Sequence, residues 1–334
     1  MSSDTRQANR PELPDLLRHY AHGAHAENTW RTYNAQWRDF AVWCDQHGAV
    51  ALPAQPQIVA EYLARRAQAG IAVASLGVTL AALRFAHTAA GVSFQLNDPI
   101  LGLVIKGIRR HHLRPQRQAE PLTGELLRQI LCQPKDVTED LRDGALLAML
   151  YLFGLRAAEA VALDWQEAGQ GRGWLRICQD RAEVVLLGSK SSPGLTERVV
   201  IPVGDNPLGM GAIGCWAAHA CIGSGEPLFR ALRRGGGVGP HRLHGSSVPR
   251  IIKAAVARHF QRLGMSRESS LVKAERFSGH SGRIGLYVTA SEAGVGPQHL
   301  AALARHAGLA MARRYAAQAD MLKCAPHRSP GVGV

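Results

Sequence analysis

Hydrophobic residues recur every three or four positions along most of this chain, which is the period of helices that bury one face. The first such stretch runs from Asn28 to about Cys44, and its apolar stripe is rich in aromatic side chains. Three more stretches follow, at about residues 55–69, 75–90 and 98–110. Four short helices within about 85 residues predict a small all-helical domain.

The residues that follow break this pattern. Positions 109–117 are basic, contain a proline and have no hydrophobic period, which is typical of a connector between domains. A chain of 334 residues is long enough for two domains. We therefore expect a flexible N-terminal arm at 1–26, a helical domain at 27–110, a linker at 111–121, a second domain at 122–325 and a disordered tail at 326–334.

The second domain mixes helical and strand patterns. Thr123 is a favourable N-cap, and the apolar run from Leu141 predicts a long buried helix that ends at Gly154. The chain becomes helical again after Ser247, which we expect to cap a helix at 248–262. The expected strands lie at 174–178, 183–187, 198–203 and 228–229. The predicted fold class is therefore mainly α with a small antiparallel β-sheet.

The charge of the chain indicates a polyanionic partner. Lys and Arg total 39 against 26 Asp and Glu, a net charge of +13, and nucleic acid is the usual partner of so basic a protein. Residues 227–276 carry +9, whereas residues 118–226 carry −5. The six cysteines show no metal-binding spacing, and no apolar run is long enough to span a bilayer. We expect reduced thiols in a cytoplasm, with no bound metal and no membrane.

Four short sequence patterns in the second domain contain side chains of the types that catalyse reactions. Each pattern alone is weak evidence for a function. They are Gly-Leu-Arg-Ala-Ala-Glu at 154–159, a lysine in a turn at 188–194, Ser-Gly-His-Ser-Gly-Arg at 278–283, and a histidine nine residues before a tyrosine. The chemical groups belong to Arg156, Glu159, Lys190, His280, Arg283, His306 and Tyr315.

In this order, the four patterns resemble the catalytic domain of the tyrosine recombinase (phage integrase) family. Residues 27–33 are similar to the start of that family's helical core-binding domain, so the resemblance covers about residues 27–325. Residues 278–285 are similar to Cre-type recombinases in particular, although Cre has Trp at the position of His306. The resemblance implies an N-terminal core-binding domain followed by a tyrosine-recombinase catalytic domain.

The chemistry of phosphoryl transfer supports this resemblance. A reacting phosphodiester gains charge on its non-bridging oxygens, and Arg156 and Arg283 can each donate bidentate hydrogen bonds to them. Glu159 lies three residues beyond Arg156, where it can orient Arg156 or His280.

Tyr315 is the candidate nucleophile. A phenol with a pKa of about 10 needs a group that helps it lose its proton; His280 and His306 can both do this, and the sequence leaves both open. Lys190 can protonate the leaving 5′ oxygen. No cofactor is expected, because cations surround the phosphate and the chain has neither a carboxylate cluster for a divalent metal nor a nucleotide-binding loop.

Further cations are candidates for contacts with DNA. Arg250 and Lys253 lie near the start of the expected helix at 248–262, which the family places in the major groove. The candidates in the first domain are Arg31, Arg84, Lys106, Arg109 and Arg110.

The sequence therefore predicts a site-specific DNA recombinase that forms a 3′-phosphotyrosyl intermediate during integration, excision or resolution of a mobile element or replicon. Its expected partner is double-stranded DNA with inverted-repeat half-sites, bound by a homodimer and brought together by a homotetramer in a prokaryotic cytoplasm, on the nucleoid. The alternatives are a type IB topoisomerase-like activity, a DNA-binding protein without catalysis, and a scaffold whose basic surface is incidental.

A bridging-sulfur substrate tests the role of Lys190. Lys190→Ala should slow cleavage of an ordinary phosphodiester strongly, whereas a substrate with sulfur at the 5′-bridging position should be cleaved nearly as fast as by the wild type, because a thiolate leaves without a general acid. Arg156→Ala is the control and should gain nothing from the sulfur. Single-turnover cleavage rates decide this, and a Lys190→Ala variant that stays slow on the sulfur substrate would show that Lys190 is not the acid.

Overall fold

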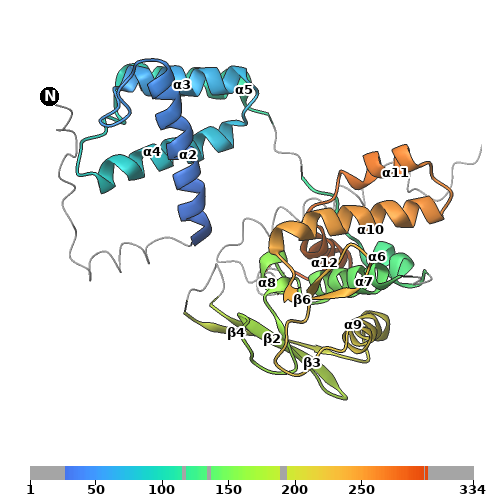
Figure 1. The fold of residues 1–334 in the computed structure, drawn as a ribbon. Coiled ribbons are helices and arrows are strands. Elements are labelled where there is room, and N and C mark those ends of the chain that lie inside the picture. The colour runs from blue at the N-terminus through green and yellow to red at the C-terminus, as the bar shows by residue number, and fades with distance from the viewer. Residues whose placement is uncertain (1–26, 115–117, 134–136, 189–193, 297, 300–334) are drawn as a thin grey trace, which may run out of the picture. The chain divides into compact units, whose positions relative to one another are not determined.

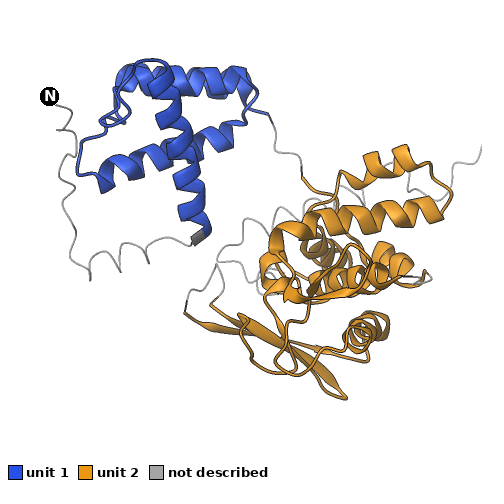
Figure 2. Ribbon diagram, viewed as in Figure 1, with its two compact units in different colours: residues 1–117 blue, residues 118–334 orange. Residues whose placement is uncertain are grey.

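The computed structural model describes residues 27–114, 118–133, 137–188, 194–296 and 298–299. The chain divides into two compact units, Met1–Arg117 and Gln118–Val334 (Figure 2). The expected arm at 1–26 and the expected tail at 326–334 lie outside the described residues.

The described part of the first unit is helical, as the hydrophobic pattern predicts. Its helices are α2 (Glu27–Gln46), α3 (Pro56–Gln68), α4 (Val73–Ala89) and α5 (Pro99–His112) (Figure 1). Their apolar faces meet in one core that contains the fully buried side chains of Phe40, Leu63, Leu83 and Leu101. The helical prediction for this part of the chain is confirmed.

Helix α5 runs further than the sequence predicts. The linker was expected to begin at residue 111, but His111 and His112 belong to the last turn of α5 together with Arg109 and Arg110. Basic side chains near a helix C-terminus interact favourably with the carbonyl end of the helix dipole. The helix therefore includes the first part of the basic segment, residues 109–112, and residues 113–117 separate it from the second unit.

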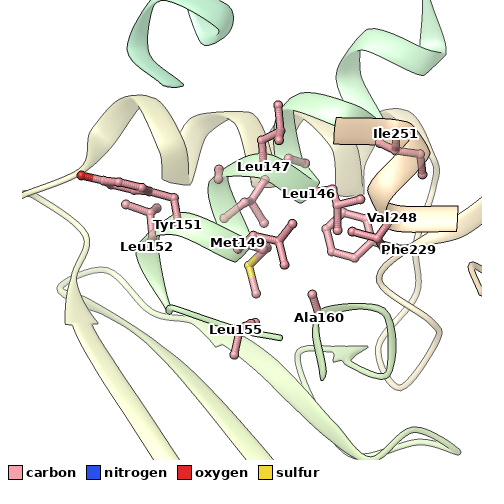
Figure 3. Close-up of a cluster of buried hydrophobic side chains, with 14 of the residues drawn as sticks. Leu146, Leu147, Met149, Tyr151, Leu152, Leu155, Ala160, Phe229, Val248 and Ile251 are labelled. Atoms are coloured by element: carbon pink, nitrogen blue, oxygen red, sulfur yellow. The ribbon is translucent and has the colours of Figure 1, made fainter. Parts of the chain in front are cut away.

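The second unit is built around α7 (Thr138–Leu152), which is buried from Arg142 to Leu152. Figure 3 shows its apolar side chains packed with Phe229, Val248 and Ile251. The helices around α7 are α6 (Gly124–Leu131), α8 (Ala157–Val161), α9 (Pro207–His219), α10 (Val248–Arg262), α11 (Arg267–Ala274) and α12 (Ser281–Glu292). Helices α6, α8, α9, α10 and α12 contact α7 directly, and α11 packs on α10.

The sheet contains the predicted antiparallel strands and an additional parallel edge. Strands β2, β3 and β4 pair antiparallel in chain order, and the two-residue β1 adds parallel to β2. A separate hairpin joins β5 to β6. The bounds are β1 Asp164–Trp165, β2 Gly173–Ile177, β3 Arg181–Leu187, β4 Thr196–Pro202, β5 Arg230–Leu232 and β6 Val238–Arg242.

The strand predicted at Leu228–Phe229 is wrong by two residues. These two side chains are fully buried in the core, and the strand itself begins at Arg230. Strands β1 and β6 were not predicted, because one is only two residues long and the other carries glycine and proline in place of an alternating apolar pattern.

The two predicted helix caps have different outcomes. The Thr123 hydroxyl accepts a hydrogen bond from the Leu126 amide at 3.2 Å, as expected. Ser247 stands directly before α10, but its side chain makes no capping bond. The preceding residues form a 3-10 turn, η1 (Gly245–Ser247), which holds Ser247 in a helical conformation; a capping residue needs an extended one.

Charged residues tie α10 to the start of α7. Asp140 and Asp143 of α7 are almost fully buried. Arg258 of α10 pairs with both of them, and its Nε lies 3.0 Å from Asp140 Oδ1. Arg262 Nη2 lies 2.6 Å from Asp140 Oδ2, and Arg142 Nη2 lies 2.6 Å from Asp143 Oδ1. Burial raises the pKa of the Asp143 carboxyl, and the two arginines beside it oppose that rise.

None of the described helices is long and apolar enough to cross a membrane.

Removing one cation from this cluster should destabilise the second unit. Arg258→Ala should lower the free energy of unfolding by about 1–3 kcal/mol, because Asp140 and Asp143 each lose one of two cationic partners and keep only Arg262 and Arg142. The matched control is Arg128→Ala, which should cost much less stability, since Arg128 pairs with Glu125 on the exposed surface of α6, where solvent weakens ion pairs. Chemical denaturation measures both, and equal losses would contradict this account of the cluster.

Candidate functional site

Arg156 lies at the sharp corner between α7 and α8. It is the N-cap residue of α8, and Leu155 before it and Ala160 after it in the sequence are fully buried in the core (Figure 3). The Glu159 carboxylate accepts two hydrogen bonds from Arg156, from the backbone amide at 2.8 Å and from Nη1 at 2.6 Å. Both side chains are only partly exposed. Glu159 therefore orients Arg156, which is one of the two roles that the sequence allows.

Arg283 joins this corner from the other end of the unit. It lies in the first turn of α12 and is 4% exposed. Its Nη1 donates a hydrogen bond to the Gly154 carbonyl at 3.1 Å, across 129 residues of sequence. Because Gly154 is two residues before Arg156, this bond brings the two predicted arginines to the same corner.

His280 precedes Arg283 by one helical turn and is exposed. Its backbone amide donates to Ser278 Oγ at 3.2 Å, and the Ser278 amide donates to Ser281 Oγ at 2.9 Å. A Cβ atom added to Gly279 would lie 3.4 Å from side-chain atoms of both Ala157 and Pro249. The loop that carries His280 therefore packs against α8, next to Arg156, and against the first turn of α10.

Lys253 forms an ion pair within the second unit. Its Nζ lies 2.6 Å from Glu275 Oε2, so it ties α10 to the segment before the His280 loop. Arg250, one turn earlier on the same helix, is exposed. Of the two α10 candidates for DNA contacts, Arg250 is presented at the surface and Lys253 is engaged in an ion pair.

The first-unit candidates for DNA contacts are all exposed. They belong to α2, α4 and α5 and comprise Arg31, Arg84, Lys106, Arg109 and Arg110.

Three predicted site residues lie outside the described part of the chain: Lys190, His306 and Tyr315. The strands that flank Lys190 in sequence are described, and they form the predicted hairpin. Leu187 pairs with Thr196, and the Gly188 amide donates to the Leu195 carbonyl at 3.0 Å.

The described site offers hydrogen-bond donors for an oxyanion. Guanidinium groups bind carboxylate or phosphate oxygens through their planar fork of N–H groups, and two of them meet at this corner with His280 nearby. Within the described ranges, no group of three or more His, Cys, Asp or Glu side chains is arranged to hold a metal ion.

Sequence reasoning missed the groups that hold the His280 loop in place. The Glu120 amide donates to the Arg276 carbonyl at 2.8 Å, and the two side chains form an ion pair. Lys253 and Glu275 form a second pair. Each joins segments that are distant in sequence, and no local spacing signals such a contact.

The relatives found by comparison with known proteins include two that match most of the chain. One is an integrase/recombinase xerD homolog of Selenomonas ruminantium, 27% identical over 310 residues, which are 89% of this chain and 84% of the relative. The other is the recombinase cre of Escherichia phage P1, 24% identical over 302 residues, with 86% and 82% covered. No family model matches the chain.

Solved structures share the fold. The Tn1549 transposon integrase in complex with transposon right end DNA covers 93% of this chain and 97% of its own, with a TM-score of 0.56 and 14% identity. A lambda integrase dimer bound to a core site covers 91% and 95%, with a TM-score of 0.52 and 15% identity. The fold predicted from the sequence is therefore confirmed.

Two substitutions separate the capping role of Glu159 from its charge. Glu159→Ala removes both bonds to Arg156 and should lower the free energy of unfolding by about 1–2 kcal/mol. Glu159→Gln keeps an amide oxygen that accepts from the Arg156 backbone and should cost less than half as much. Chemical denaturation of both variants tests this, and equal losses would show that the backbone bond contributes nothing.

Proposed function

The chain belongs to the tyrosine recombinase family, enzymes that cleave and rejoin DNA strands, and from that membership we propose that it recombines DNA at specific sites through a phosphotyrosyl intermediate. The observation that carries the proposal is the bond from Arg283 to the Gly154 carbonyl. It holds Arg283 two residues from Arg156, although the two arginines are far apart in sequence, and the reaction of this family needs both on one phosphate.

The two arginines and Glu159 stabilise the transition state. Arg156 and Arg283 donate to the non-bridging oxygens as negative charge develops on them. Glu159 fixes the Arg156 guanidinium through its 2.6 Å bond, so little reorientation is needed when the phosphate reacts. In this proposal His280, which is exposed beside Arg156, donates to the same phosphate or accepts the tyrosine proton.

The remaining roles fall to residues of the chain beyond those described. The Tyr315 oxygen attacks phosphorus and forms the 3′-phosphotyrosyl bond, while the bond to the 5′ oxygen breaks and that oxygen takes a proton from Lys190. His306 or His280 accepts the tyrosine proton. In the second step a 5′-hydroxyl of the partner duplex attacks the phosphotyrosine and gives its proton to Lys190, and Tyr315 leaves and regains its proton from the histidine. The number of phosphodiester bonds is unchanged, so no external energy source is required.

Double-stranded DNA with inverted half-sites is the proposed substrate. Two protomers bind one site, and four assemble for strand exchange in a prokaryotic cytoplasm, on the nucleoid. Arg250 and the exposed first-unit cations Arg31, Arg84, Lys106, Arg109 and Arg110 are the proposed DNA contacts. Such contacts with phosphates make binding weaken steeply as the salt concentration rises.

Trapping the covalent intermediate tests the proposal. Wild-type protein incubated with a nicked half-site duplex should form a DNA adduct that survives denaturing electrophoresis, whereas Tyr315→Phe should form none. Half-site affinity should be nearly unchanged, because only a phenol oxygen is lost and affinity comes mainly from phosphate contacts.

The control is Tyr151→Phe, which removes a phenol oxygen from the buried face of α7 and should keep the adduct. Adduct formation by Tyr315→Phe would show that another residue is the nucleophile. Exchange of strands between two sites, compared with relaxation of a supercoiled plasmid alone, separates a recombinase from a topoisomerase.

A further inference from the structure

The segment that enters the second unit runs directly onto the His280 loop. The Glu120 amide donates to the Arg276 carbonyl at 2.8 Å, and the Leu122 amide donates to the Ser281 carbonyl at 2.9 Å. These two bonds bracket residues 276–281, which contain His280. The residues of the first bond, Glu120 and Arg276, also form an ion pair through their side chains.

Packing brings the same segment against α12. Leu122 is fully buried in the core of the unit, and Ala119 packs on the cluster of Ile284, Tyr287 and Val288 on α12. A Cβ atom added to Gly285 would lie 1.8 Å from the Leu122 carbonyl oxygen. The backbone of residues 118–122 therefore lies directly on the first turns of the helix that carries Arg283.

We propose that Glu120 and Arg276 are positioning residues, which hold residues 118–122 on the loop that presents His280 and Arg283. The pair acts by fixing the loop. The catalytic consequence rests on the proposed function, whereas the effect on the loop does not.

Hydrogen exchange of the free protein tests the positioning without any activity. In Glu120→Gln, the amides of Ser281 and Ile284, which bond to the Ser278 and His280 carbonyls, should exchange faster than in the wild type. The matched control is Glu125→Gln, which removes an exposed acidic partner of Arg128 on α6 and should leave these amides unchanged. Equal exchange in the two variants would overturn the proposal.

Cleavage kinetics tests whether the Glu120–Arg276 pair affects the rate of catalysis. At saturating protein, Glu120→Gln should cleave a nicked half-site about two- to fivefold more slowly than the wild type, the range of one exposed ion pair, with unchanged half-site affinity and melting temperature. The charge-swapped double variant, Glu120→Arg with Arg276→Glu, should restore the rate. A lower affinity at an unchanged rate, or a swap that restores nothing, would contradict the positioning role.

Gly285→Ala provides a second and stronger perturbation of the same contact. The added methyl group must displace the Leu122 backbone from α12, so exchange at Ser281 and Ile284 should rise further. Gly214→Ala on α9 meets no atom within 4 Å and is its control. If Gly285→Ala does not fold, the Glu120 variants decide the question alone. If the wild type forms no covalent adduct, the proposed function fails, and hydrogen exchange still decides whether the pair holds the loop.

Discussion

The site depends on a buried cation bonded to a backbone carbonyl. Arg283 is 4% exposed, donates to the Gly154 carbonyl, and lies with its guanidinium 5.8 Å from the Tyr287 ring centre. A buried charge is costly unless polar groups compensate for it, and the Gly154 carbonyl is such a group. The close approach of α12 to Leu122 fixes the helix that carries the Arg283 side chain. The cation is thus fixed before substrate binds, which is what transition-state stabilisation by preorganised donors requires.

The remainder of the site is held by contacts that spread over the whole unit. Glu159 orients Arg156 from within the same short helix, whereas the His280 loop is fixed from α10 through Lys253 and from residues 118–122 through Arg276. Ion pairs between α7 and α10 connect that framework to the core. The basic residues of the chain therefore serve two purposes, since some are exposed candidates for phosphate contacts and others hold the unit together.

The local sequence pattern predicts most of the helices and strands. The features that it misses depend on contacts between residues that are distant in sequence. The helical periods and the alternation of β2, β3 and β4 are properties of single segments, so they are visible in the sequence. The same holds for Thr123 as a cap and for Arg156 at a helix start. Strand β1 is a strand only because it pairs with β2, and the partner of Lys253, Glu275, lies 22 residues away. Spacing alone cannot reveal such partners.

Replacing the charged phosphate of the substrate tests the central claim most directly, namely that Arg156 and Arg283 neutralise charge on one phosphate. A methylphosphonate at the cleavage position has lost one non-bridging negative charge, so it needs fewer cations in the transition state. We predict that Arg156→Ala and Arg283→Ala, both deficient on ordinary DNA, regain covalent adduct formation on the methylphosphonate duplex. Persistent failure of both folded variants on the neutral substrate would contradict the account, because their defect would then not be one of charge.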